Sequence, residues 1–235
     1  MTDRESRQIK AQKILTILHD LWSDRLTELR CLDLGCGIGI IANHLAKQVR
    51  LIIAMDSDWV LISQVSPGLA RLQGDGLKLP FGNATFDLVI CAQVYEHVRD
   101  PTQLIDEIIR VLKPGGLCYF SGPNRLWPYE YHYRVWFIHW LPRKWFHKAL
   151  AWLGREHSLE ITLYTYRQLR RLWRGLVLYD YTARLIHEPE RFPGANAPKW
   201  MRHIPYSLIS RLVFVMPNFN WILMKPINDN KESLL

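Results

Sequence analysis

Apolar residues recur along this chain in short runs that alternate with amphipathic segments. Ile14, Leu15, Leu18 and Leu21 follow helical spacing and predict a first helix over Ile9–Leu21. The runs that follow predict strands at residues 30–36, 51–56, 70–75, 86–93 and 117–123, with helices between them at residues 40–49, 58–66 and 101–113. Because these strands are apolar on both faces, they predict an α/β fold in which helices cover a parallel sheet.

The alternation of strand and helix is interrupted beyond Pro123. An aromatic and basic insertion follows the fifth strand, and the rhythm resumes with a helix at residues 165–175 and a strand at residues 176–186. A second, proline-rich insertion at residues 187–218 precedes a last strand at residues 220–226. A chain of 235 residues is long enough for one such domain with elaborations and short for two.

Charge is spread unevenly along the chain. The net charge is +8, and residues 125–174 contain ten basic and only three acidic side chains. The same stretch holds six of the ten tryptophans. We therefore expect the partner of this segment to be anionic and partly apolar.

The four cysteines lie in or beside apolar runs, without CxxC spacing or a histidine pair. They predict small core residues and neither a zinc site nor a disulfide framework. The first 22 residues begin with charged side chains and resemble an amphipathic helix, not a secretory signal. We expect a cytoplasmic protein.

Three glycines follow the first strand in the segment LDLGCGIGI, residues 32–40. A glycine-rich turn lets a ligand approach the main chain. Asp56 closes the next strand, 21 positions after Gly35, where a carboxylate accepts hydrogen bonds from both hydroxyls of a ribose. A dinucleotide-binding turn would need glycine at position 40, where this chain has Ile40. The pattern indicates a nucleoside-containing cofactor of another kind.

The third and fourth strands also end in polar residues. Asp75 follows the third strand and is expected to accept from an adenine amine, while the N–H of Gly76 or Leu77 reaches a ring nitrogen. Gln93 ends the fourth strand. It either lies under the reactive end of the cofactor or is only a polar strand end.

Five segments in order, LDLGCGIG, AMDSD, GDGLKLPF, FDLVICAQVYEHVRDP and LKPGGLCYFSGPN, resemble the class I S-adenosylmethionine-dependent methyltransferases of the small-molecule, type 11-like kind. The resemblance spans residues 32–124. It implies S-adenosyl-L-methionine as the cofactor. It also implies a Rossmann-like, seven-stranded, mostly parallel sheet with helices on both faces and an antiparallel last strand.

The family pattern assigns the methionine part of the cofactor to the first turn. Gly35, Cys36 and Gly37 would hold it with their main chain, and Asp33 would support its amino group or only cap the strand end.

The same pattern assigns the nucleoside to the next two strand ends. Asp56 would take the ribose, and Ser57 would either touch the ligand or cap the following helix. The adenine would lie against Asp75, Gly76 and Leu77.

Methyl transfer is an in-line displacement, so the main tasks of such an enzyme are to align the acceptor and exclude water. A hydroxyl acceptor benefits from a general base, for which His97 is the candidate; its alternative role is to fix its own loop. Tyr131 and His132 follow the fifth strand and are candidate acceptor-site residues. We expect no metal.

The insertion contains the sequence PRKWFHKALAWLGRE, residues 142–156. At helical spacing one face is apolar and the other basic, which is typical of a helix in a membrane interface. The apolar face is expected to consist of Trp145, Phe146, Ala149, Leu150, Trp152 and Leu153. The alternatives are a helix that closes the substrate pocket and an RNA-binding segment.

The sequence therefore predicts one methyltransferase domain over residues 1–235, peripheral to the membrane, that methylates an oxygen of a large apolar or lipid-linked acceptor. Its alternatives are a tRNA-modifying methyltransferase and a non-catalytic partner subunit that keeps the cofactor fold. The expected parts are an N-terminal capping helix (1–30), a cofactor-binding core (31–124), a substrate or membrane insertion (125–160) and the C-terminal part of the sheet (161–226).

Overall fold

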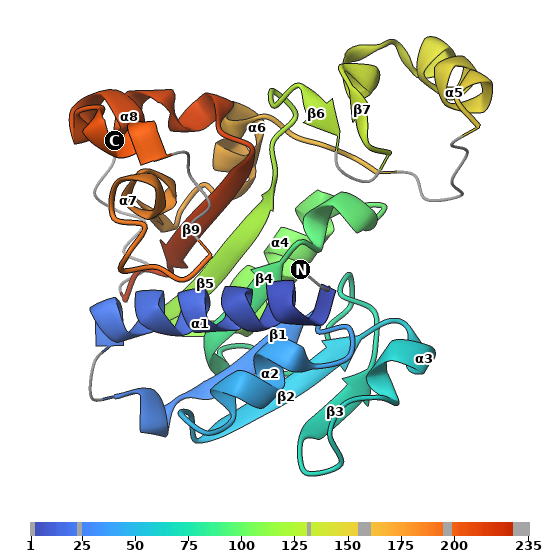
Figure 1. Ribbon diagram of the computed structural model, residues 1–235. Helices are drawn as coiled ribbons and strands as arrows, with labels where there is room; N and C mark the ends of the chain where they lie inside the picture. The colour runs from blue at the N-terminus through green and yellow to red at the C-terminus, as the bar shows by residue number, and fades with distance from the viewer. Residues whose placement is uncertain (1–2, 23–24, 131–132, 155–160, 195–198, 228–235) are drawn as a thin grey trace, which may run out of the picture.

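A seven-stranded sheet forms the centre of the described protein (Figure 1). The computed structural model describes residues 3–22, 25–130, 133–154, 161–194 and 199–227. The strands are β1 (Arg30–Leu34), β2 (Leu51–Asp56), β3 (Ala70–Gln73), β4 (Phe86–Ala92), β5 (Leu112–Pro123), β8 (Val177–Asp180) and β9 (Asn218–Met224). Their order is β3-β2-β1-β4-β5-β9-β8, and β9 alone is antiparallel to its neighbours. The predicted Rossmann-like sheet with an antiparallel last strand is confirmed.

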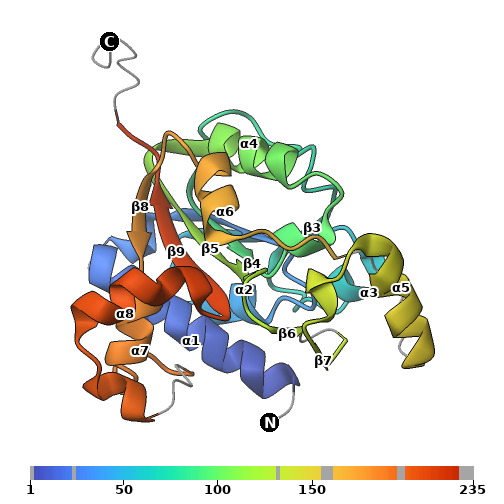
Figure 2. The same cartoon turned by 90° about the horizontal axis from the view of Figure 1, so that it is seen from above.

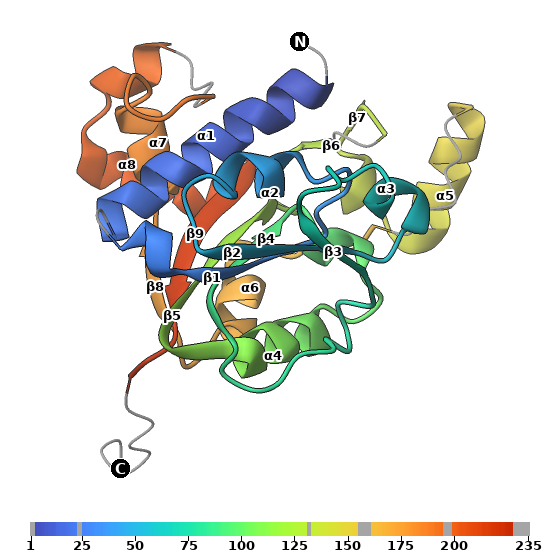
Figure 3. The same ribbon diagram turned by 90° about the horizontal axis from the view of Figure 1, so that it is seen from below.

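Helices cover both faces of this sheet (Figure 3). One layer comprises α1 (Asp3–Trp22), α2 (Ile40–Leu45), α3 (Trp59–Ile62) and α7 (Thr182–His187), and the other comprises α4 (Pro101–Val111) and α6 (Tyr166–Leu172). Strand β4 shows why both layers are needed, because Leu88 and Ile90 join the first apolar cluster while Val89 and Cys91 join the second. Apolar side chains on both sides of a strand require a cover on both sides.

The chain order changes direction at the middle of the sheet. Strand β1 lies between β2 and β4, so the connections after β1 and after β4 leave toward opposite edges. In open α/β sheets such a switch point opens a crevice at the carboxyl ends of the strands. The glycine turn, Asp56 and Gln93 all follow strands that end there.

Two insertions lie at the same end of the molecule, beyond the carboxyl end of β5 (Figures 1 and 2). The first contains β6 (Tyr129–Glu130), β7 (Val135–Trp136), η3 (Ile138–Trp140) and α5 (Arg143–Trp152). The second contains η4 (Lys199–His203), α8 (Tyr206–Leu212) and η5 (Val213–Val215). Asn124 connects the beginning of the first insertion to the end of the second, since its side-chain amide donates to the carbonyls of Phe214 and Met216, both at 2.8 Å.

Some predicted bounds were wrong. The strand expected at residues 176–186 ends at Asp180, because the Asp180 carboxylate accepts from the N–H of Thr182 at 2.9 Å and turns the chain into α7. The helix expected at residues 58–66 ends at Ile62, where the Arg71 guanidinium donates to the carbonyls of Ser63 and Val65. Two elements are longer than predicted: α1 begins at residue 3 instead of residue 9, and β5 begins at residue 112 instead of residue 117.

The predicted apolar face of the insertion helix is divided in the structure. Phe146, Ala149 and Leu150 pack against Tyr133 and Ile138 in a small cluster of their own. The remaining members, Trp145, Trp152 and Leu153, are exposed. Helix α5 therefore uses half of its apolar face to attach itself to the hairpin and leaves the other half uncovered.

Candidate functional site

Hydrogen bonds to β2 and close packing fix the conformation of the glycine turn after β1. The N–H groups of Gly35 and Cys36 both donate to the carbonyl of Met55 on β2, at 2.8 and 3.0 Å. Gly35 has φ +69°, and a Cβ at this position would lie 2.5 Å from Cγ2 of Val94. A larger residue would meet both backbone strain and a clash, so glycine is required here. Gly35 is partly exposed, whereas Cys36 and Gly37 are buried.

Asp56 connects the end of β2 to the glycine turn. Its Oδ2 accepts from the N–H of Gly37 at 2.8 Å, and its Oδ1 accepts from the N–H of Asp58 at 3.0 Å. Each carboxylate oxygen has about two acceptor positions, so one backbone donor on each leaves room for a hydroxyl on each. The arrangement suits a vicinal diol.

Asp33 is buried beneath the glycine turn, where its Oδ2 accepts from the N–H of Ala42 in the first turn of α2 at 3.0 Å. Burial raises the pKa of this carboxyl to about 7, and the charge of Asp56 adds to the increase. The Ala42 N–H and the Arg7 charge oppose it. Asp33 thus caps a helix, and a cation near the turn would favour its ionised form.

The residue after Asp56 does not cap α3. Asp58 is the N-cap, since its carboxylate accepts from the N–H of Val60 at 2.8 Å. The capping alternative for Ser57 is therefore wrong. Ser57 is exposed beside Asp56, and its carbonyl accepts from the side-chain amide of Gln73 at 3.1 Å.

The loop after β3 is folded on itself and against α4. Asp75 Oδ1 accepts from the N–H of Leu77 at 2.9 Å, and Gln103 Nε2 donates to the carbonyl of Leu77 at 2.8 Å. A Cβ on Gly76 would lie 3.0 Å from Cδ1 of Leu104. Because the Leu77 N–H is engaged by Asp75, Gly76 is the better of the two predicted donors to an adenine ring.

Strand β4 ends in a residue with an unusual backbone. Gln93 has φ +61° and donates its N–H to the carbonyl of Ser121 on β5 at 2.7 Å. A left-handed conformation is costly for a residue with a side chain, and it redirects the Gln93 side chain at the strand end.

His97 lies in the short helix η2 (Tyr95–His97), which follows Gln93. Its Nε2 is 3.9 Å from Oε1 of Glu96, a buried carboxylate. The carbonyl of Glu96 accepts from the N–H of Thr162, so the end of the first insertion is attached to this loop. The imidazole is only partly exposed and lies beside a carboxylate at the edge of the crevice.

The other two candidate catalytic residues, Tyr131 and His132, lie outside the described residues. Their neighbour Tyr133 is buried in the small cluster under α5, and its N–H donates to Oε2 of the buried Glu130 at 2.7 Å.

Comparison with known proteins identifies the core. Residues 32–120 match the family model described as a methyltransferase domain. A probable S-adenosylmethionine-dependent methyltransferase of Mycolicibacterium smegmatis is 35% identical over 116 residues, which cover 46% of this chain and 45% of that protein. The core of the chain, residues 32–120, is therefore similar to the S-adenosylmethionine-dependent methyltransferases.

Two further proteins resemble this chain. A ubiquinone biosynthesis O-methyltransferase of Rickettsia canadensis is 31% identical over 127 residues, 50% of this chain and 52% of that protein. The crystal structure of an S-adenosylmethionine-dependent methyltransferase from Mesorhizobium loti superposes with a TM-score of 0.61 at 16% identity, covering 92% of this chain and all of that one. The chain spans about half the length of the curated relatives it matches.

The sequence analysis did not identify two residues of the candidate site. Arg7 on α1 reaches over the glycine turn, and a Cβ on Gly37 would lie 3.0 Å from its Nη1. Glu96 brings a buried carboxylate next to His97. The sequence carries no local signal for Arg7, because its position depends on how α1 packs on α2. Glu96 could have been found from the sequence, because it directly precedes the candidate base His97.

The described part of the chain contains no group of three or more His, Cys, Asp or Glu residues arranged to hold a metal ion. In the same residues, no helix is long and apolar enough to cross a bilayer. All four cysteines, Cys31, Cys36, Cys91 and Cys118, are buried and free, as core residues.

Proposed function

We propose that this chain transfers the methyl group of S-adenosylmethionine to an oxygen of a sizeable apolar or lipid-linked acceptor, acting as a peripheral protein at the inner face of the membrane. The observation that supports the methyl-transfer proposal is the bridge between Asp56 and Gly37, which fixes a carboxylate with room for a diol beside the glycine turn. The similarity to a ubiquinone biosynthesis O-methyltransferase supports oxygen as the acceptor atom.

The residues around the turn fit the amino-acid part of the cofactor. Its methionine portion would lie on the main chain of Gly35, Cys36 and Gly37, with its ammonium group toward the buried carboxylate of Asp33.

The nucleoside would occupy the next two strand ends. Asp56 would accept both ribose hydroxyls, with Ser57 beside it, and the adenine would contact Asp75, Gly76 and Leu77. Gln93 would lie under the sulfonium, because its left-handed backbone turns the side chain at the end of β4. When bound, this cofactor supplies an electrophilic methyl carbon.

His97 is the residue proposed to receive the acceptor proton. His97 would take the proton of the acceptor hydroxyl, while the bound cofactor would supply the methyl group and its sulfur would be the leaving group, so that the products would be a methyl ether and S-adenosylhomocysteine. The carboxylate of Glu96, 3.9 Å from Nε2, would stabilise the imidazolium. Tyr131 and His132 remain candidate acceptor-site residues.

Calorimetry with S-adenosylhomocysteine tests the cofactor site. Asp56→Ala removes the acceptor of the ribose hydroxyls and should weaken binding by about 100-fold, the loss typical of hydrogen bonds to a charged group. Asp58→Ala is the matched control, because it removes the α3 cap two residues away and should leave the affinity within about threefold. Equal affinities of wild type and Asp56→Ala would contradict the assignment.

The acceptor is tested with methyl-labelled S-adenosylmethionine and a membrane extract. We expect label to enter the organic phase, as alkali-stable methyl ether, and His97→Ala to reduce that rate without changing cofactor affinity. Label found in RNA would favour the tRNA-modifying alternative.

A further inference from the structure

The first insertion exposes more aromatic surface than any role in its own packing explains. We use the term insertion surface for its exposed side chains Arg134, Trp136, Phe137, Trp140, Leu141, Lys144, Trp145, Lys148 and Trp152. Trp145 is 59% and Trp152 is 86% exposed. Isolated exposed apolar residues need no explanation, but a contiguous set of large ones marks an interaction site.

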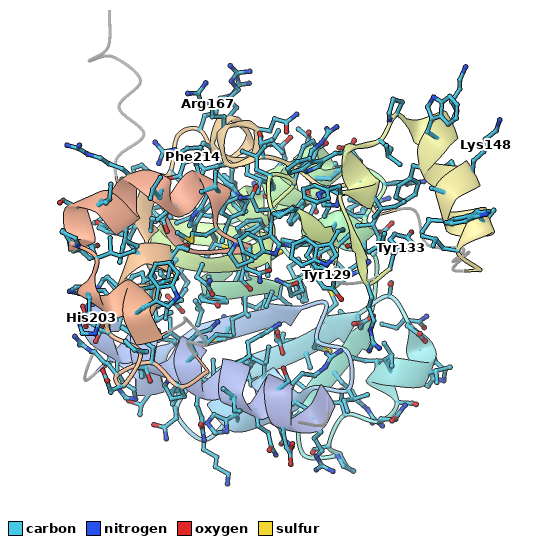
Figure 4. The ribbon with its side chains drawn as sticks, turned by 45° about the horizontal axis from the view of Figure 1, so that its top comes forward. Tyr129, Tyr133, Lys148, Arg167, His203 and Phe214 are labelled. Atoms are coloured by element: carbon cyan, nitrogen blue, oxygen red, sulfur yellow. The ribbon has the colours of Figure 1, made fainter. Side chains whose placement is uncertain are left out.

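Helix α5 presents a mixed stripe on its outer side. Trp145, Lys148 and Trp152 follow one another at spacings of three and four, so they share one helical face. The Lys148 ammonium lies 5.7 Å from the centre of the Trp145 ring. Figure 4 shows Lys148 extending from α5 at the edge of the molecule, away from Tyr133. The stripe combines indole rings with a cation and has no cover in the described protein.

The hairpin and η3 continue this stripe with a cluster of rings. Trp136 packs edge-on against Tyr129 at 5.2 Å, and Phe137 packs edge-on against Trp140 at 5.0 Å between ring centres. The indole N–H of Trp140 donates to the carbonyl of Arg125 at 2.8 Å. Because this polar atom is satisfied internally, the outward part of the ring is apolar.

Charge on the insertion surface has one sign. Residues 131–154 contain four arginines and lysines and no acidic residue. The preceding acid, Glu130, is buried. An interface that is both cationic and apolar complements a surface that is anionic outside and apolar beneath.

We propose that the insertion surface docks onto an anionic lipid bilayer, with the tryptophans at the headgroup level and Lys144 and Lys148 on lipid phosphates. This inference deepens the proposed function, on which its role in acceptor delivery rests. Lipid is favoured over RNA because Trp136 and Phe137 pack edge-on against neighbouring rings and Lys148 lies over the Trp145 ring, which leaves fewer open ring faces for bases to stack on.

The same insertion is tied to the acceptor side of the site. The N–H of Arg125 donates to the carbonyl of Tyr164, and the N–H of Thr162 donates to the carbonyl of Glu96, next to His97. The two ends of the insertion are therefore attached to each other, and the second end is attached beside the candidate base. A bilayer that holds the insertion surface would lie next to the mouth through which an apolar acceptor must enter.

Vesicle flotation without cofactor tests the docking. The chain should float with vesicles of phosphatidylcholine and phosphatidylglycerol and much less with phosphatidylcholine alone. Trp145→Ala with Trp152→Ala should lower the affinity for the anionic vesicles on the order of tenfold. Trp59→Ala is the matched control, because Trp59 on α3 is equally exposed, at 60%, and should change nothing.

A second pair of substitutions tests how much the positive charge contributes to vesicle binding. Lys144→Gln with Lys148→Gln should lower the affinity for anionic vesicles on the order of tenfold and leave the weak binding to phosphatidylcholine unchanged. Lys47→Gln with Arg50→Gln, also exposed, is the control. Undiminished flotation of either test pair, binding of bulk tRNA in place of vesicles, or a dimer that dissociates in the tryptophan variant would overturn the proposal.

The experiments distinguish a failure of the cofactor-site proposal from a failure of the membrane-docking proposal. Asp56→Ala should float as wild type does, since the insertion surface needs no cofactor. Normal cofactor binding without flotation would refute docking alone, and flotation without cofactor binding would refute the cofactor site alone.

Discussion

At the scale of single residues, the polar side chains of the candidate site are fixed by hydrogen bonds within the protein. Asp56 is fixed by two backbone N–H groups and Asp33 by one. Side chains that are oriented before the ligand arrives lose little rotational freedom on binding. Of these carboxylates, Asp33 differs because burial raises its pKa to about 7.

Cofactor affinity should therefore depend on pH through Asp33. The raised pKa, about 7, means that the carboxyl is largely protonated at about pH 6 and largely ionised at about pH 8. Only the ionised form attracts an ammonium group, so the affinity for S-adenosylhomocysteine should rise over this interval. Calorimetry in two buffers of different ionisation enthalpy should detect proton release on binding.

Asp33→Asn is the control for this effect. It keeps an oxygen to accept from the Ala42 N–H and removes the titration, so its affinity should be lower than that of wild type at high pH and nearly constant with pH. A wild type whose affinity does not change with pH would contradict the contact between Asp33 and the ammonium group.

The sequence predicted the residues whose position depends on local structure. Asp56 and the glycines follow strand ends directly, so the order of elements was enough to bring them to one crevice. Arg7 could not be predicted, because it reaches Gly37 only through the packing of α1 across α2. The sequence left open whether Ser57 caps α3, since serine and aspartate both cap helices, and the structure shows that Asp58 is the cap.

At the scale of elements, helix α4 connects the site to the second apolar layer. It begins directly after the loop that carries His97, with Pro101 in its first turn. Asp100 caps it by accepting from the N–H groups of Thr102 and Gln103, at 3.0 and 3.1 Å.

Asp100→Ala should lower the free energy of unfolding by about 1 kcal/mol, the usual value of an N-cap. Asp100→Ser should recover most of this loss, since a serine hydroxyl also accepts from the first turn. Urea denaturation measures both. An alanine variant as stable as wild type would show that the cap contributes nothing to stability.

Element bounds were less predictable than element types. The run at residues 176–186 is apolar throughout, and only the Asp180 carboxylate, turned onto the Thr182 N–H, separates strand β8 from helix α7. Helix α5 shows a second limit. Its apolar face is visible in the sequence, but which half packs against Tyr133 and Ile138 depends on a hairpin that the sequence analysis did not predict.

At the scale of the whole molecule, two parts differ in how firmly they are held. The sheet lies between two extensive apolar clusters, whereas the insertion rests on a small one around Tyr133, Ile138 and Leu150. Figures 1 and 2 show α5 at the periphery, away from the sheet. Segments with few buried apolar contacts open more often than a core does.

Hydrogen exchange should therefore differ between these parts. Amides of α5 should exchange on the order of 100-fold or more faster than those of β4 and β5, because local opening of the small cluster exposes them. Anionic vesicles should slow exchange in α5 and leave β4 unchanged. Equal protection of α5 and β4 in free protein would contradict the weak attachment.

The bridge from Asp56 to Gly37 has a consequence for turnover in the cell. Apart from Gln93 under the sulfonium, every contact proposed in the site engages the sugar, base or amino-acid portion, and these portions are identical before and after the methyl group has left. Spent cofactor should therefore occupy the crevice about as firmly as fresh cofactor does. The rate of methyl transfer would then depend on the concentration ratio of S-adenosylmethionine to S-adenosylhomocysteine around the protein. It would therefore fall wherever the demethylated product accumulates.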